Sequence, residues 1–292
     1  MLKRLPLISL TFALSLSAIQ SLPQPANGQA LVPHVLQLDG DQLEQQGLIL
    51  VQEAAQLAQF QQYQLALVRA QLASQLVPDN SQAWALLGSL YLQTEQYDPA
   101  IRTLLKAKSL DEKNSAVLFA LGSAYFQQED YSASVQYFKS GLKLKPDMPG
   151  ALFGLGNAYY KLEQYDEAIQ QHQKAIEIDE KFWPAVNNIG LIRYEQGDTE
   201  DAIAQWQKAV AIDGNQPEPK LALAIALYAQ GMDAKALELG EAALKLDSRY
   251  ADIEFLQKNL WGERLVGEAQ KFLAVPQIRE LLSQIKDESL TQ

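Results

Sequence analysis

The sequence has no cysteine among its 292 residues. This absence excludes disulfides, a lipid-modified cysteine, thiolate metal sites and cysteine nucleophiles together. Histidine is almost as scarce, with only His34 and His172. The chain also lacks a two-histidine metal spacing, a glycine-rich phosphate loop and a serine nucleophile elbow. We therefore expect no enzymatic activity, no cofactor and no metal site.

Basic residues are in short supply as well. The chain has 24 Lys and Arg against 35 Asp and Glu, which gives a formal net charge of −11. Nucleic acids and anionic membrane surfaces attract basic proteins, so this balance argues against either as a main partner. The acidic residues are scattered along the chain, as is typical of a solvated surface.

No apolar run is long enough for a comfortable membrane span. The longest covers residues 5–19, whereas a span needs about 20 predominantly apolar residues. Lys3 and Arg4 precede this run, and Ala30 ends a stretch with the small residues that a signal peptidase reads. We predict that residues 1–30 are a secretory signal, with an uncleaved membrane anchor as the alternative. The protein is then expected in a periplasm or thylakoid lumen, or anchored to a membrane.

One pattern of residues recurs every 34 positions through the middle of the chain. Apolar residues recur at three- and four-residue steps on either side of a short polar break, which predicts two antiparallel amphipathic helices in each repeat. A period of this size is typical of a solenoid in which each unit contacts only its neighbours. The clearest copy consists of Trp84, Leu87, Gly88, Tyr91, Tyr97, Ala100 and Ala107.

Several positions of the repeat stay small in every copy. Small side chains let helix axes approach closely, and large residues beside them fill the grooves. Glycine inside a helix costs about 0.5 to 1 kcal/mol relative to alanine, so a repeated helical glycine needs a packing reason. We predict close helix crossings at Gly88, Gly122, Gly156 and Gly190.

This pattern resembles the tetratricopeptide repeat, whose Trp-x2-Leu-Gly-x2-Tyr signature is matched most fully from Trp84 onward. The resemblance implies an all-α fold, a right-handed superhelical solenoid of six helical hairpins with C-terminal capping helices. Arg193 and Leu227 replace the first-helix tyrosine in the last two units. Continued in both directions, the register places the units at residues 47–80, 81–114, 115–148, 149–182, 183–216 and 217–250.

The two ends of the repeat array differ from its middle. Residues 31–46 are predicted to be a linker and helix entry. After residue 250 the next unit begins and fails, because Gln257 and Lys258 stand where the register demands apolar residues. We predict a capping helix over residues 251–261, then an interruption, then a final amphipathic helix over residues 276–286 within the C-terminal segment 251–292.

In a solenoid of this family the first helix of each unit lines the concave surface. Its inward positions are rich in aromatic residues with a few amides, which suit the binding of a peptide segment. The alternative is that several of these rings pack against neighbouring hairpins. The predicted partner-binding groove consists of Phe119, Phe126, Phe153, Asn157, Tyr160, Asn187, Asn188, Leu191, Tyr194 and Tyr228.

Members of this family that grip a C-terminal carboxylate use two asparagines and three basic residues. Asn157 and Asn188 match the asparagines, but Phe153, Glu218 and Ala222 stand where the basic residues belong. A carboxylate-clamp chaperone partner is therefore disfavoured. Binding of an extended or helical protein segment through its apolar side chains fits better.

We therefore predict a non-catalytic protein–protein interaction scaffold for the assembly or maintenance of a membrane-associated complex. The signal, the glutamine-rich first unit and the acidic repeats resemble the tetratricopeptide factors of cyanobacterial thylakoid biogenesis, including one that binds protochlorophyllide oxidoreductase. That resemblance implies a photosynthetic complex. Two other hypotheses stay open: a self-associating structural scaffold, and an accessory subunit of an enzyme system.

Overall fold

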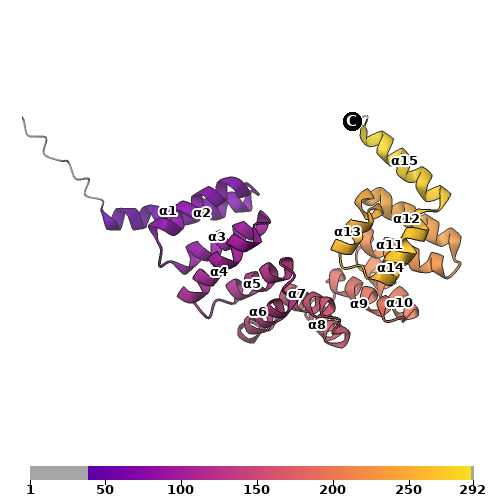
Figure 1. The fold of residues 1–292 in the computed structure, drawn as a ribbon, viewed down its shortest axis with the longest axis horizontal. Helices are drawn as coiled ribbons and strands as arrows, with labels where there is room; N and C mark the ends of the chain where they lie inside the picture. Colours follow the sequence, from indigo (N-terminus) through magenta and orange to yellow (C-terminus); the bar gives the residue numbers. More distant parts are fainter. Residues whose placement is uncertain (1–38, 291–292) are drawn as a thin grey trace, which may run out of the picture. The chain divides into compact units, whose positions relative to one another are not determined.

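The computed structural model describes residues 39–290, and every regular element in that range is helical (Figure 1). The predicted signal and the first half of the predicted linker lie outside the described residues. Twelve of the helices alternate as the first and second helices of six hairpins. The first helices are α1 Gly40–Gln59, α3 Ser81–Gln93, α5 Ser115–Gln127, α7 Pro149–Lys161, α9 Trp183–Glu195 and α11 Pro217–Ala229. The second helices are α2 Tyr63–Leu76, α4 Tyr97–Leu110, α6 Tyr131–Leu144, α8 Tyr165–Ile178, α10 Thr199–Ile212 and α12 Asp233–Leu246.

Each first helix packs against its own second helix, and each second helix packs against the first helix of the next unit. The second helices begin 34 residues apart throughout, and α3 to α11 begin at the first residue of units two to six. The predicted all-α solenoid of helical hairpins is therefore confirmed. Unit one differs, because α1 begins at Gly40, where Asp39 accepts hydrogen bonds from the amides of Asp41 and Gln42. Part of the predicted linker is thus helical.

The turn inside each hairpin also repeats every 34 residues. The second of its three residues has a positive φ in all six units, which closes the first helix with a left-handed residue. In unit two, for example, the amide of Gln96 then donates to the carbonyl of Tyr91 at 2.8 Å. Glycine takes this conformation at no steric cost, but only the last two units use it. The six residues are Gln61, Glu95, Glu129, Glu163, Gly197 and Gly231.

The repeated helical glycines lie where the two helices of a hairpin cross. A Cβ atom at Gly156 would lie 2.6 Å from a ring carbon of His172, and one at Gly190 would lie 2.6 Å from the indole nitrogen of Trp206. Gly88 and Gly122 meet large side chains in the same way. The predicted packing reason for these glycines is therefore confirmed. The facing residues also follow the 34-residue period: Leu104, Phe138, His172 and Trp206.

The chain beyond α12 folds differently from the prediction. It forms a short 3-10 turn Ser248–Ala251, then α13 Ile253–Lys258, α14 Glu263–Leu273 and α15 Pro276–Leu290. The expected capping helix over residues 251–261 is present as α13 but is shorter, because Asp252 caps its start and Leu260, just beyond its end, has a φ of 68°. The predicted interruption is confined to residues 259–262, since α14 begins after Gly262 and runs through Gly267. The expected final helix lies within α15.

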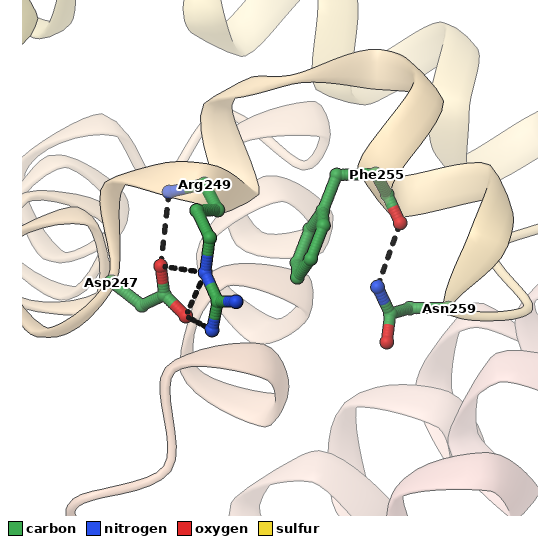
Figure 2. A network of polar contacts seen from close by, with 4 residues as sticks. All are labelled: Asp247, Arg249, Phe255 and Asn259. Carbon is green, nitrogen blue, oxygen red and sulfur yellow. Dashed lines mark hydrogen bonds and ion pairs between the residues drawn. The ribbon is translucent and has the colours of Figure 1, made fainter. Parts of the chain in front are cut away.

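The junction between α12 and the C-terminal helices is held by local polar contacts (Figure 2). Asp247 accepts a hydrogen bond from the backbone amide of Arg249 and pairs with its guanidinium, the shortest of these contacts being 2.7 Å. The guanidinium also lies over the ring of Phe255, 5.1 Å from its centroid. Asn259 donates to the Phe255 carbonyl at 2.7 Å. These contacts fix the direction in which α13 leaves the last hairpin.

The C-terminal helices complete the core of units five and six. α14 packs against α9 and α11, and α15 packs against α12 (Figure 1). Trp206 and Leu221 share one buried cluster with Leu256, Leu265 and Phe272 from the C-terminal segment. The capping helices are therefore part of the folded array. In the described residues, no helix is both long and apolar enough to cross a membrane.

Candidate protein-binding surface

All ten residues of the predicted groove lie on first helices, as the period requires, but they differ in exposure. Five of them are partly exposed and five are buried. The partly exposed residues are Phe119 and Phe126 on α5, Phe153 and Asn157 on α7, and Tyr228 on α11. The buried residues are Tyr160 on α7 with Asn187, Asn188, Leu191 and Tyr194 on α9.

The helix that covers α9 is the chain's own α14. The carboxylate of Glu195, the last residue of α9, accepts hydrogen bonds from the backbone amides of Arg264 at 3.1 Å and Leu265 at 3.0 Å. Glu195 thereby caps the N-terminus of α14, where unpaired amides favour a negative charge. Arg264 in turn donates to the Tyr194 carbonyl at 3.0 Å, and its guanidinium lies over the Tyr194 ring. On this part of the groove, α14 occupies the place expected for a partner.

A chain of polar side chains runs beneath this cover. Asn188 donates to Asn157 at 2.8 Å, Asn187 donates to Asn188 at 3.1 Å, and the Trp261 indole donates to Glu218 at 3.1 Å. Burial raises the pKa of Glu218 to about 7, although hydrogen bonds from Trp261, Asn187 and Tyr250 oppose the shift.

The two asparagines that match the carboxylate clamp are therefore bonded to each other. This network of polar side chains contains no basic group, and it includes the carboxyl of Glu218. A carboxylate brought to this place would meet an acid and no cation. The geometry therefore favours apolar recognition over a clamp.

Several of the predicted groove rings are used for packing. A side chain at Gly141 would collide with the ring of Phe119, so Phe119 fills that space. The ring of Tyr228 packs edge-on against Phe272 at 5.4 Å, and that of Tyr160 lies 5.8 Å from Tyr165. These three rings therefore pack between neighbouring helices, which was the alternative to a role in partner binding.

The open part of the predicted groove is a recess of about 230 Å³ between α5 and α7. Phe126 and Phe153 line it, and Phe138 from α6 lies against Gly154. The recess exists because short residues face it, and a Cβ atom at Gly150 would have nothing within 4 Å. Its volume is comparable to that of one large apolar side chain. The complete lining is Ser123, Phe126, Gln127, Phe138, Gly150, Phe153, Gly154 and Asn157.

Three residues of this recess, Phe126, Phe153 and Asn157, belong to the groove predicted from the sequence, whereas its small residues were not predicted. Gly150 and Gly154 are four positions apart and therefore share one face of α7. They stand outside the repeated glycine series that Gly156 belongs to. The sequence signal for the recess was the presence of these two glycines on a first helix in addition to the repeated glycine, Gly156.

The arrangement offers little to catalysis. Among the described residues, no group of three or more His, Asp and Glu side chains lies close enough to hold a metal ion. His172 is fully buried in the crossing between α7 and α8, and burial lowers its pKa to about 3. His34 lies outside the described residues. What the surface offers chemically is apolar shape beside amide side chains.

Comparison with known proteins agrees with the repeat assignment. Tetratricopeptide repeat models match residues 81–114 and 149–182, and a model described as TPR repeat matches residues 122–163 and 190–231. No curated protein matches the sequence.

Many solved structures share the fold. PilF of Pseudomonas aeruginosa superimposes with a TM-score of 0.61 at 16% identity, covering 76% of this chain and 98% of that one. The Cut9–Hcn1 hetero-tetramer of the APC/C superimposes with a TM-score of 0.63 at 16% identity, covering 79% of this chain and 44% of that one. MamA from Desulfovibrio magneticus RS-1 superimposes with a TM-score of 0.55 at 16% identity, covering 59% of this chain and 97% of that one. Such identities show the fold alone, whereas the family models identify tetratricopeptide repeats within residues 81–114, 122–182 and 190–231 of this chain.

Proposed function

We propose that this protein is a non-catalytic scaffold that binds a segment of another protein across α5 and α7. One apolar side chain of that segment would enter the recess between the two helices. The observation that carries the proposal is the combination of short residues at Ser123, Gly150 and Gly154 with aromatic walls at Phe126 and Phe153. Concave, mostly apolar sites with a few polar groups are where proteins hold ligands.

The rest of the groove supports this choice of position. Units five and six are closed by α14, so a partner has access to the first helices only in the earlier units. Aromatic anchors in a pocket carry much of the binding energy of protein interfaces. Asn157 stays partly exposed at the edge of the recess and provides an amide beside the apolar site.

The partner can be identified by photo-cross-linking. A photoreactive phenylalanine at position 123 should capture the bound segment in native cells, whereas the same residue at position 140 should not. Ser140 is the matched control because it is also an exposed serine but lies on the second helix α6, outside the recess. Equal capture from both positions would place the interface elsewhere.

Substitution of Ser123 by leucine should then block the site. The leucine side chain would fill the recess, so we expect binding of the captured segment to weaken at least tenfold, about 1.4 kcal/mol. Titration by fluorescence anisotropy measures this, and circular dichroism should show unchanged helicity. Ser140→Leu should bind as the parent does. If Ser123→Leu binds with parental affinity, the recess is not the binding site.

We also propose that the scaffold acts outside the cytoplasm, on the assembly or maintenance of a membrane-associated complex. Lys3, Arg4 and the apolar run over residues 5–19 support export. Intact mass of the protein from its own cells tests this, with Leu31 as the expected first residue. A chain that retains Met1 and fractionates with membranes would favour the anchor. A chain that retains Met1 in the cytoplasm would contradict export.

A further inference from the structure

The second helix of unit one has an apolar stripe on its solvent-facing side. Leu65, Val68 and Leu72 on α2 are 59%, 59% and 44% exposed. Their spacing of three and four residues places them on one face of the helix. The buried residues Ala66 and Ala70 face the hairpin interior instead. The stripe is therefore directed away from the core of its own unit.

The repeat register shows that this stripe is peculiar to unit one. The same three positions carry no leucine, isoleucine, valine or aromatic residue in any other unit. A terminal repeat normally needs a polar outer face for solubility, so an apolar one requires a partner surface. The equivalent residues are Pro99, Arg102 and Lys106 in unit two; Ala133, Gln136 and Ser140 in unit three; Glu167, Gln170 and Lys174 in unit four; Asp201, Ala204 and Lys208 in unit five; and Lys235, Glu238 and Ala242 in unit six.

Exposed apolar side chains are concentrated in this first hairpin. Of the eleven large hydrophobic residues exposed in the described part of the chain, six lie between Leu48 and Leu72. Ile49 is 44% exposed because the described residues place no hairpin before α1, whereas its counterparts Ala83 and Val117 are buried. The opposite end of the array is covered by its own C-terminal helices. Within residues 39–290, the first hairpin therefore has the larger exposed apolar surface.

Charge indicates what covers this surface. Arg69 is the only charged residue of α2, and it is paired with Glu53 of α1 at 3.2 Å. Uncharged Gln64, Gln71 and Gln75 lie on α2 beside the stripe. In a protein of net charge −11, two copies repel each other, and they can approach at least cost through a neutral face. A basic partner would instead favour the acidic surfaces.

We propose that α2 is a self-association surface on which a second copy of this chain packs its own α2. A two-fold interface uses the same patch on both subunits, so each residue of the stripe has to meet a residue of the same stripe. Val68 is the middle residue of the three, and it would lie near the two-fold axis. Leu65 of one copy would then contact Leu72 of the other. The spacing of the stripe is that of a coiled-coil seam.

Sedimentation of the full chain over a range of micromolar concentrations tests the proposal. We expect the mass to rise from the monomer value of 32.5 kDa toward twice that value. A variant with the residues of unit four, Leu65→Glu, Val68→Gln and Leu72→Lys, should stay monomeric at the same concentrations. Leu144→Lys is the matched control, because Leu144 is 47% exposed on another second helix and should leave the dimer unchanged.

Cysteine chemistry locates the contact independently, because the chain has no cysteine of its own. Val68→Cys should form a disulfide-linked dimer under mild oxidation, and Ser140→Cys should not. A parent that stays monomeric throughout, or a triple variant that still dimerises, would overturn the proposal. If the triple variant unfolds, the contrast between the two cysteine variants decides. A monomer that cosediments with phosphatidylcholine vesicles would identify lipid as the occupant and also overturn it.

Discussion

Replacement of Phe272 by alanine should lower the free energy of unfolding by about 3 to 5 kcal/mol, the usual cost of removing a fully buried aromatic ring. Phe272 belongs to α14 and is completely buried in the core of units five and six. Its ring contacts Tyr228 and occupies the space beside Gly240. Truncation would leave a cavity between α12 and α14. Urea denaturation followed by circular dichroism measures the loss.

The position of Phe272 has a specific cause in the repeat register. In units two to five, the second helix fills this place with Leu104, Phe138, His172 or Trp206, whereas unit six has Gly240 there. Phe272 therefore supplies from α14 the bulk that α12 lacks. Gly240→Leu alone should be destabilising, because its side chain would collide with the Phe272 ring.

The two substitutions should compensate each other when they are combined. Gly240→Leu with Phe272→Ala restores a large residue at the register position, so we expect a coupling energy of about 1 to 3 kcal/mol in a double-mutant cycle. The control pairs Phe272→Ala with Gly150→Leu, which lies in open space, and should be additive. Additivity in the Gly240 cycle would show that Phe272 does not take the place of the missing side chain.

The periodic part of the fold was predictable because its causes are local and repeat with the sequence. A glycine such as Gly88 in a first helix, a large residue such as Leu104 sixteen positions later and a turn residue such as Glu95 all lie within one unit. Each unit then needs only its neighbours. The residue pattern of one unit therefore predicted the positions of the helices in the others.

The C-terminal helices were not predictable in this way, because their contacts cross the period. Glu195 caps α14 through the amide of Leu265, 70 positions away. Gly262 and Gly267 suggested an interruption, yet α14 forms because its buried face packs against α9 and α11. Tertiary packing overrides the intrinsic cost of a helical glycine. One signal was present, namely that Gly240 breaks the series of bulky residues.

The predicted groove was only partly recoverable from residue types. Phe119 and Phe153 occupy equivalent positions on α5 and α7, but only Phe153 lines the recess. Gly141 lets Phe119 turn into its own hairpin, where unit four has Ala175. Phe153 also packs against His172 and Phe182, with ring centroids 5.4 Å and 5.6 Å apart, while it lines the recess. An aromatic residue at an inward position is therefore compatible with packing and with binding, and its residue type does not distinguish the two.

Acid should destabilise this protein through His172. Its ring is fully buried, and neither ring nitrogen has a hydrogen-bond partner within residues 39–290. Burial lowers the pKa from the usual 6.5 to about 3, because the charged ring would lose its hydration. The unfolded chain therefore takes up the proton near pH 6.5 and the folded chain only near pH 3. This contribution to stability is complete above pH 6.5 and falls by about 1.4 kcal/mol per pH unit between those limits.

Glu218 acts in the opposite direction over part of this range. Its pKa is raised from the usual 4.5 to about 7, so the folded chain binds this proton more readily than the unfolded chain. Acidification from pH 7 to 4.5 therefore stabilises the fold through Glu218 while it destabilises the fold through His172. The pH dependence of the parent's free energy of unfolding combines the two effects. The difference in free energy of unfolding between the parent and a variant at His172 isolates the contribution of His172.

His172→Leu provides that difference. Leucine is close to histidine in volume, and Leu104 already occupies the equivalent position in unit two. At pH 8 the variant should be at least as stable as the parent, since it removes two unpaired buried nitrogens. At pH 5 its advantage should have grown by about 2 kcal/mol, as measured by urea unfolding at both pH values. The control is Phe138→Leu at the same register position, whose stability difference from the parent should not change with pH. A His172→Leu difference that is flat from pH 8 to pH 5 would mean that the folded protein protonates this ring as easily as the unfolded chain does, which contradicts its enclosure between α7 and α8.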